Sequence, residues 1–482
     1  MTDTIIHPEI QPHSSEPGSK NRYIIMLMIL AGVLMAVVDG SVVSIALPTI
    51  TGYFNVSVAE SEWVMTSYLV TLTSLLLIFG KVAERTGKAR LFGLGIALFT
   101  LSSLACGISS SLGQLILFRV IQSAGAAMMF SISAAMVFQV FPRGEQGRAM
   151  GYIGATVAIG SIIGPSLGGF IVEILGWQYI FLINVPIGMV LMALSARYLR
   201  VEERRSSRLN MDWPGALALV LFMVSLMAFL GELASSFAIQ PATVALAAIC
   251  LVSLIAFVAV ERRQKVPLLD LSVFGYPRFV LPSISMIIFF VSNLMVSVLG
   301  PFYFEGVMGY NPSQVGLIYL IVPAIMVIGS PFTGWLYDKH HNRYYAALGM
   351  AVLALSLMLM GYMAGTAVPN PEMLLLTFVP VGIGAALFQS PNNTEVMRAL
   401  PREKMNIASS FTATVRNLGM ALGVSLSSVL VSLQLAQAGY FGAILDAGPG
   451  LLSSSISRVM MLAGALCIVG TVTCIIRGVE SA

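Results

Sequence analysis

Long runs of apolar residues are the feature that most constrains how this chain can fold. A helix needs about 20 such residues to cross the hydrocarbon core of a bilayer. Fourteen runs come close to that length or exceed it: 24–48, 61–80, 91–109, 112–140, 149–174, 178–198, 213–233, 240–260, 279–304, 313–336, 344–364, 371–394, 405–434 and 456–476. Because no water in the core can satisfy free backbone groups, each run is predicted to be an α-helix.

The composition excludes a water-soluble globule. Of the 482 residues, 57% are hydrophobic and only 10% are charged, whereas soluble domains average about 25% charged residues. A bilayer removes the need for a polar surface, because lipid chains can then cover the apolar exterior. The sequence therefore predicts an all-α polytopic membrane protein, multi-pass in the cell membrane and in contact with its lipid.

The placement of basic residues predicts the orientation of these spans. Lys and Arg collect in the cytoplasmic loops of membrane proteins. If the N-terminus is cytoplasmic, 23 of the 26 Lys and Arg residues fall in inner segments. The other three are Arg119, Arg416 and Arg458. A wrong number of spans would scramble this alternation, so both termini are predicted to be cytoplasmic.

Two inner loops echo one another. They read Gly80-x-x-x-Glu84-Arg85-x-Gly87 and Gly334-x-x-x-Asp338-Lys339, after the second and the tenth span. An acid and bases in such a loop can form ion pairs that hold one closed arrangement, although they could equally be charges that only set the topology. The repeat indicates two related halves of six helices, an arrangement found in transporters with a site between the halves.

This repeat defines the predicted domains. Residues 1–22 form a disordered cytoplasmic tail, and 23–199 form the N-terminal six-helix half. Residues 200–278 hold cytoplasmic loops and two inserted helices, and 279–482 form the C-terminal six-helix half.

Several classes of function are excluded by missing motifs. The four cysteines show no metal-ligand spacing, and no histidine lies in a span, which disfavours metal-dependent chemistry in the membrane. The basic residues form no stripe for nucleic acid. No nucleotide-binding loop or nucleophile elbow occurs. The chain is therefore predicted to be no enzyme, to hold no metal or cofactor, and to draw energy from an ion gradient.

Charged residues inside spans are costly and mark function by default. Asp39 is the one carboxylate deep in the first-half spans, and Arg119 lies in the fourth span, followed by Gln122. At a rise of 1.5 Å per residue, Asp39 and Arg119 both lie about two-thirds of the way toward the outside. An acid and a base at one depth can pair.

A run of glycines interrupts the fifth span. It reads Gly160-x-x-x-Gly164-Pro165-x-x-Gly168-Gly169. Glycines at this spacing allow close helix contact, and proline bends a helix. We expect a bent, tightly packed helix between the two halves, although generic membrane packing would use the same residues.

Taken together, these motifs resemble the major facilitator superfamily, and in particular its fourteen-span drug:proton antiporter branch of the EmrB/QacA type. The stretch Trp177-Gln-Tyr-Ile-Phe181-x-x-Asn184 also matches and is interpreted as structural. The resemblance implies the major facilitator fold, with two inserted central helices. Glu84 departs from the family pattern, which has Asp there.

The resemblance also implies roles for named residues. Proton coupling is expected at Asp39, Arg119 and Glu305. Gating is expected at residues of the inner loops and the fifth span: Gly80, Glu84, Arg85, Gly87, Gly160, Gly164, Pro165, Gly168, Gly169, Gly334 and Asp338. The cavity candidates are Gln122, Gln389, Asn393 and Arg416.

Three functions remain open at this stage. The favoured one is a proton-coupled antiporter whose partners are protons and a small molecule, with drugs or other amphipathic cations as substrates. Export of an endogenous lipid or metabolite, or uptake, is the alternative within the same class. A non-transporting membrane scaffold or sensor is the alternative from another class, and it has no use for costly buried charges.

Overall fold

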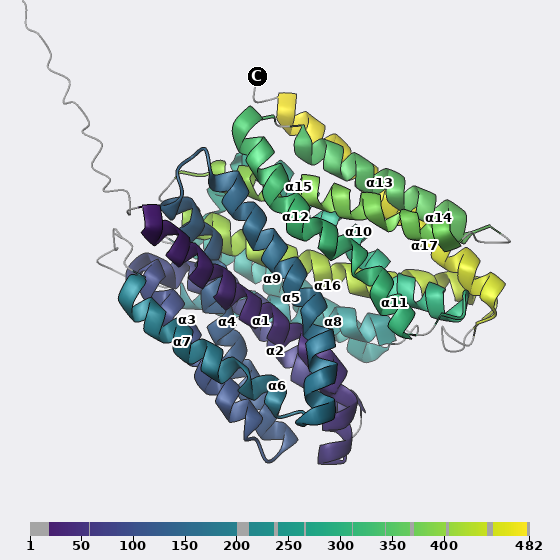
Figure 1. Ribbon diagram of the computed structural model, residues 1–482, viewed down its shortest axis with the longest axis horizontal. Helices are drawn as coiled ribbons and strands as arrows, with labels where there is room; N and C mark the ends of the chain where they lie inside the picture. Colours follow the sequence, from purple (N-terminus) through teal and green to yellow (C-terminus); the bar gives the residue numbers. More distant parts are fainter. Residues whose placement is uncertain are drawn as a thin grey trace, which may run out of the picture.

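The computed structural model in Figure 1 consists of helices joined by short loops. It describes residues 19–56, 58–199, 212–235, 240–264, 267–310, 312–342, 344–366, 371–401, 404–440 and 447–479. Every regular element within these ranges is helical, as the apolar runs predict.

The N-terminal half contains seven helical segments. They are α1 (Ser19–Phe54), α2 (Val58–Thr86), α3 (Lys88–Gly107), α4 (Leu112–Val140), α5 (Gln146–Ile174), α6 (Tyr179–Leu182) and α7 (Asn184–Tyr198). Helix α1 begins inside the predicted tail 1–22, of which residues 1–18 lie outside the described ranges. Its first turn is anchored by Arg22, which lies 3.3 Å from Glu145.

The inserted pair and the C-terminal half follow. The pair is α8 (Trp213–Ser235) and α9 (Pro241–Arg263), followed by the short 3₁₀-helix η1 (Leu271–Gly275). The half contains α10 (Pro277–Gly306), α11 (Pro312–Tyr319), α12 (Ile321–His340), α13 (Tyr345–Ala364), α14 (Pro371–Leu376), α15 (Phe378–Arg398), α16 (Met405–Gln437) and α17 (Pro449–Val479).

Thirteen segments of the described residues are long and apolar enough to cross a membrane. They match thirteen of the fourteen predicted spans. The remaining predicted span, 149–174, is occupied by α5, a continuous helix of 29 residues in which some side chains, including that of Pro165, lie outside the described ones.

Three predicted spans are each broken into two helices by a turn residue. The breaks fall between α6 and α7, between α11 and α12, and between α14 and α15. In each case a proline follows four residues after the last residue of the first helix: Pro186 after Leu182, Pro323 after Tyr319 and Pro380 after Leu376. Proline has no N–H to donate to the carbonyl four residues back, so the hydrogen-bond ladder stops there.

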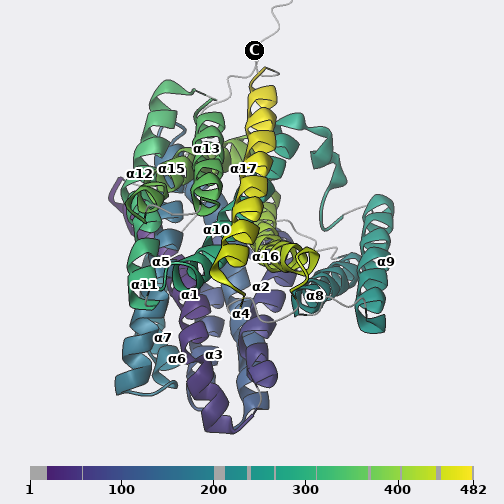
Figure 2. The ribbon, with the colours of Figure 1, turned by 90° about the vertical axis from the view of Figure 1, so that its right-hand side faces the viewer.

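The two halves have separate hydrophobic cores. Buried side chains of α1 to α5 form most of one, and buried side chains of α10 and α12 to α17 form most of the other. Helix α8 packs on α2 and α16, where Leu77 and Ile407 meet Leu219 and Met223. Figure 2 shows α9 at the outer edge of the molecule, beside α8.

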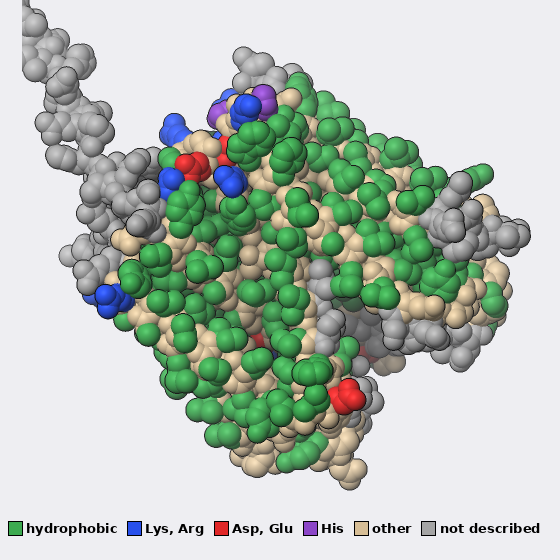
Figure 3. Space-filling view, in the orientation of Figure 1, with side chains coloured by type: hydrophobic (Ala, Val, Ile, Leu, Met, Phe, Trp, Pro, Cys, Tyr) green, Lys and Arg blue, Asp and Glu red, His purple; other side chains and the backbone are tan. Residues whose placement is uncertain are grey.

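One end of the bundle carries most of the described basic residues, and we name it the basic face. Its members are Arg22, Lys81, Arg85, Lys88, Arg90, Arg143, Arg148, Arg197, Arg262, Arg263, Arg278, Lys339, Arg398 and Lys404. Figure 3 shows basic side chains gathered at the upper left, while hydrophobic side chains cover the flank. In Figure 1 the two halves meet near this face and diverge toward the other end of the bundle, here named the opposite face.

The glycines of the fifth span pack α5 against α1. A Cβ on Gly160 would lie 2.8 Å from Val37, one on Gly168 would lie 2.5 Å from Val42, and one on Gly164 would overlap Ser41. These contacts join two helices of one half. Helix α5 itself lies between the halves as expected, because it also packs on α12 and α15, but the glycine run holds it to α1. The run spaced by four residues lines one side of α5, and α1 belongs to the same half.

Gly164→Leu is expected to destabilise the protein by about 1–3 kcal/mol, because overpacking a tight interface forces side chains and backbone apart. Gly169→Ala is the matched control, since a Cβ there would meet Ile45 at 3.8 Å, an ordinary contact. The measurement is the thermal unfolding midpoint of the purified protein in detergent. Equal midpoints for the two variants would contradict the packing described for α1 and α5.

Candidate functional site

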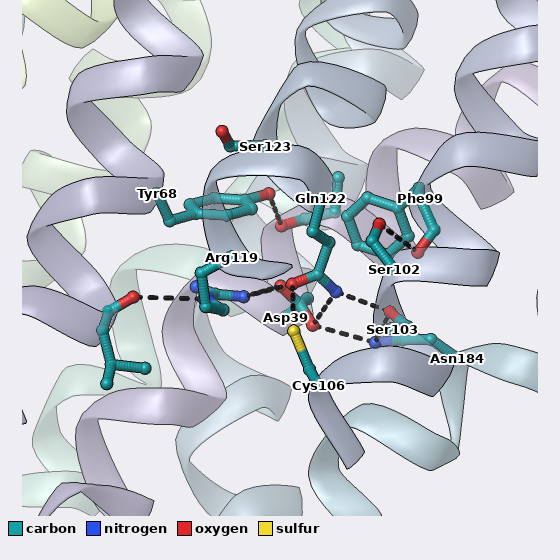
Figure 4. A network of polar contacts seen from close by, with 12 residues as sticks. Asp39, Tyr68, Phe99, Ser102, Ser103, Cys106, Arg119, Gln122, Ser123 and Asn184 are labelled. Atoms are coloured by element: carbon teal, nitrogen blue, oxygen red, sulfur yellow. Dashed lines mark hydrogen bonds and ion pairs between the residues drawn. The ribbon is translucent and has the colours of Figure 1, made fainter. Parts of the chain in front are cut away.

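A fully buried ion pair lies in the N-terminal half. Asp39 of α1 and Arg119 of α4 are 1% and 0% exposed, and their side chains approach to 2.5 Å. Figure 4 shows the carboxylate and the guanidinium facing each other between the helices. The structure therefore brings together the acid and the base that the sequence places at one depth.

The carboxylate of Asp39 has further hydrogen-bond donors. Gln122 Nε2 donates to Asp39 Oδ1 at 3.0 Å, and Asn184 Nδ2 donates to the same oxygen at 2.9 Å. Ser103 Oγ accepts from Gln122 Nε2 at 2.5 Å. These amides hold the ionised carboxylate in place, because each donates to an oxygen that carries negative charge.

Arg119 is held on its other sides as well. Its Nη1 donates to Gln122 Oε1 at 2.8 Å, and its Nε donates to the backbone oxygen of Val64 at 3.1 Å. The guanidinium carbon lies 4.1 Å from the ring centroid of Tyr68, a cation–π distance. Nη2 is buried and has no hydrogen-bond partner within the described residues.

This arrangement can couple a proton to a change of shape. While Asp39 is ionised, the pair is neutral overall and can remain in a low-dielectric site. A proton on the carboxylate would remove that neutrality and leave Arg119 as an uncompensated buried charge. The packing around Arg119 would then have to change.

The sequence predicts Asp39, Arg119 and Gln122 as site residues but not three of their partners. Asn184 was assigned a structural role, and Ser103 and Tyr68 were not singled out. Asn184 follows Phe181 at a fixed spacing in its motif, and an amide within an apolar segment needs a partner. That need for a hydrogen-bond partner is the signal from which a polar contact of Asn184 could have been predicted.

A second polar cluster joins the two halves at the basic face, and we name it the latch. Asp338 of α12 accepts a hydrogen bond from the backbone N–H of Arg148, 2.9 Å away in the first turn of α5. Arg398 of α15 donates to Asp338 at 3.1 Å and to the backbone oxygen of Arg143 at 2.5 Å. A carboxylate is stabilised at a helix N-terminus, so Asp338 caps a helix of the other half.

Glycines allow the backbones to meet beside the latch. A Cβ on Gly147 would lie 2.7 Å from the backbone oxygen of Gly334, and one on Gly154 would lie 2.6 Å from Gln389 Oε1. A Cβ on Gly151 would overlap the backbone of Ser330. The interface between the halves therefore uses glycines nearer the start of α5 than the predicted run.

The equivalent loop of the N-terminal half is arranged differently. Glu84 pairs with Lys81 on its own helix at 2.7 Å, and Arg85 is exposed. Gly80 lies against Ser410 of α16, and Gly87 has a φ of 86°, which favours glycine. Both copies of the motif thus contact the other half, but through different residues. The second copy uses the Asp338 carboxylate, whereas the first copy packs Gly80 against Ser410 and keeps Glu84 paired on its own helix.

The remaining predicted site residues are spread over the C-terminal half. Glu305 lies near the end of α10 at the opposite face, half-buried, and its carboxylate makes no hydrogen bond or ion pair within the described residues. Gln389 faces Gly154 at the interface. Asn393 is half-buried. Arg416 of α16 lies with its guanidinium carbon 5.3 Å from the ring centroid of Phe130.

Asp338→Ala is expected to favour separation of the halves at the basic face by about 1.5–3 kcal/mol, the contribution of hydrogen bonds to a charged group. Spin labels are attached at Gly144→Cys and His340→Cys in a background without the native cysteines. Double electron–electron resonance then reports the distance between the start of α5 and the end of α12. The variant should populate longer distances. Asp270→Ala is the control, because Asp270 bonds to Lys404 instead, at 2.5 Å. An unchanged distance distribution in Asp338→Ala would show that the latch does not hold this state.

Comparison with known proteins places this geometry in context. The model of the Major Facilitator Superfamily matches residues 29–424. The riboflavin transporter RibZ of Clostridioides difficile (strain 630) is 32% identical over 410 residues, which are 85% of this chain and 88% of that protein. The multidrug resistance protein Stp of Mycobacterium tuberculosis (strain ATCC 25618 / H37Rv) is 30% identical over 404 residues, 83% of this chain and 74% of that protein.

Solved structures share the fold. The human organic anion transporter MFSD10 (TETRAN) superposes with a TM-score of 0.63 at 13% identity, over 92% of this chain and 99% of that one. The proton:xylose symporter XylE, bound to 6-bromo-6-deoxy-D-glucose, gives a TM-score of 0.63 at 14% identity, over 93% of this chain and 95% of that one. At these identities the likeness concerns the fold alone.

Proposed function

The chain belongs to the Major Facilitator Superfamily, and we propose that it is a proton-coupled antiporter that exports drugs or other amphipathic small molecules by alternating access. The observation that carries this proposal is the buried Asp39–Arg119 pair. A transporter driven by protons needs an acid that can change its charge inside the membrane. Asp39 is such an acid, and its partner is a base that responds to the change.

The proposed cycle begins with Asp39 ionised and paired. A proton that arrives from the outside neutralises the carboxylate and weakens its attraction to Arg119. The released guanidinium then favours another arrangement of α1 and α4 relative to the rest of the half. Release of the proton to the cytoplasm restores the pair, and Arg119 tunes the exchange. Glu305 is the second acid for this role.

The latch provides the gate in this proposal. With the basic face assigned to the cytoplasm, the latch closes that side, and the halves diverge toward the outside. The positive-inside rule supports the assignment of both termini to the cytoplasm. Opening the latch would then expose the space between the halves to the cytoplasm.

Two other functions are weighed against export of drugs. A relative with 32% identity is named a riboflavin transporter, which favours a metabolite as substrate and leaves uptake as an alternative direction. Relatives named multidrug resistance proteins support the leading proposal. A scaffold or sensor is disfavoured, because it would keep a buried ion pair at a cost in stability.

Asp39→Asn is expected to abolish proton-driven transport, because asparagine cannot exchange a proton at working pH. The measurement is substrate-induced proton movement in proteoliposomes that carry a pH gradient. Glu173→Gln, an exposed acid at the opposite end of α5 from the latch, is the control and should keep the wild-type rate. Coupled antiport by Asp39→Asn at that rate would transfer the carrier role to Glu305.

The single variant leaves Arg119 buried without its partner, which costs about 3–5 kcal/mol. The double variant Asp39→Asn, Arg119→Gln removes both charges and should recover most of that stability. Its failure to couple protons while folding normally would separate the loss of coupling from a loss of folding.

The orientation is tested by labelling in intact cells. A cysteine at Phe274, in η1 of the proposed cytoplasmic side, should be shielded from impermeant thiol reagents. A cysteine at Gly113, in the first turn of α4, should react, because the proposal places that turn outside. Both positions are exposed. The reverse pattern of labelling would overturn the cytoplasmic assignment of the basic face.

A further inference from the structure

Arg416 is a charge inside the membrane that has no countercharge. It lies in α16, and no hydrogen bond or ion pair involves its guanidinium within the described residues. Its side chain is only partly buried, in contrast to Arg119, which is fully enclosed by partners. The side chain of Arg416 therefore keeps part of its surface free of protein contacts.

Arg416 lies inside a membrane-spanning helix, nearer its basic end. It is 11 residues from the start of α16 at Met405, about 16 Å from the basic end. Phe130 is 10 residues from the end of α4 at Val140, about 15 Å from the same end. Both side chains thus lie about a third of the way along their helices from the basic end, within the membrane-spanning segments. They come from opposite halves, so their contact lies on the surface between the halves.

This site is separate from the proton site. Arg119 is 21 residues from Val140 on the same helix as Phe130, about 31 Å from the basic end. Arg416 therefore lies about 15 Å nearer the basic face than the Asp39–Arg119 pair. The negative charge of Asp39 is already compensated by Arg119, so Arg416 has no countercharge from this pair.

The surroundings of Arg416 suit a polar aromatic ligand. Ser409 and Thr412 lie seven and four residues earlier on α16, on the same face as Arg416. Their hydroxyl oxygens are buried and lack partners within the described residues. The ring of Phe130 adds an aromatic surface at 5.3 Å from the guanidinium carbon. A guanidinium presents N–H donors in a plane that matches a carboxylate, and it stacks on aromatic rings.

We propose that Arg416 binds the anionic group of the transported substrate, so that the protein prefers amphipathic anions with a planar aromatic body. The proposal rests on the export function proposed above and specifies its substrate class. It reverses the expectation that cations are the preferred drugs, because a cationic ligand beside Arg416 would meet like charge in a medium of low dielectric. The anion would supply the countercharge that no described residue provides.

Two dyes with one ring system test the preference. Fluorescein carries negative charge at pH 8, and rhodamine 6G carries positive charge on the same xanthene body. Binding of each dye to the full chain in lipid nanodiscs is measured by fluorescence anisotropy. Wild type should bind fluorescein more tightly than rhodamine 6G. Arg416→Gln should weaken fluorescein binding about ten-fold or more, the loss expected for a charge-assisted contact, and should leave rhodamine 6G binding equal or tighter.

The controls separate binding from folding. Arg458→Gln removes an exposed arginine near the start of α17, at the opposite face, and should leave both affinities unchanged. Arg416→Lys keeps the charge and should retain part of the fluorescein affinity. Because Arg416 has no hydrogen-bond or ion-pair partner among the described residues, Arg416→Gln should unfold at the wild-type temperature or above it. A lower unfolding temperature would instead assign Arg416 a structural role and overturn the proposal.

The remaining outcomes are also decisive. No saturable binding of fluorescein to wild type, or equal affinity in Arg416→Gln, would overturn the anion site. Proton-driven dye export is measured separately in proteoliposomes. Arg416-dependent binding without such export would leave the anion site standing and would contradict the proposed antiport. Proton-driven export of rhodamine 6G without export of fluorescein would contradict the anion site and leave the proposed antiport standing.

Discussion

A charge in the hydrocarbon core must find a partner, because water is not there to solvate it. This constraint explains why the basic residues of the chain gather at one end of the bundle. It also explains why Asp39 and Arg119, deep in the N-terminal half, are surrounded by donors and acceptors from several helices. Arg416 is the exception, because no described residue pairs with its guanidinium, and this indicates that the missing partner comes from outside the chain.

Close backbone contact determines how the two halves meet. Without a hydrophobic effect between helices in lipid, association depends on van der Waals packing and hydrogen bonds, and glycine lets backbones approach. Helix α5 makes two sets of such close glycine contacts. Its glycines near the basic face contact α12 and α15 of the other half, and its later glycines contact α1 of its own half. One helix therefore links the gate at the basic face to the helix that carries Asp39.

The two copies of the repeated loop motif have diverged in their contacts. Asp338 is buried and caps α5 of the other half, whereas Glu84 pairs within its own loop. The first copy meets the other half through Gly80, which packs against Ser410 of α16. The connection between the halves therefore uses a hydrogen-bonded carboxylate at one copy of the motif and close helix packing at the other.

The sequence alone determined the all-helical class and the approximate place of the spans, because lipid requires an apolar run and internal hydrogen bonds in each span. It also placed Asp39 and Arg119 at one depth, since the rise of a helix is fixed. Only the tertiary structure decided which faces meet. Asn184 reaches Asp39 across 145 residues of chain, and the glycine run of α5 faces α1. The helical period determines on which face of its helix a residue lies, but not which residue it meets. The absence of a hydrogen-bond or ion-pair partner for Arg416 among the described residues is therefore a property of the packed helices.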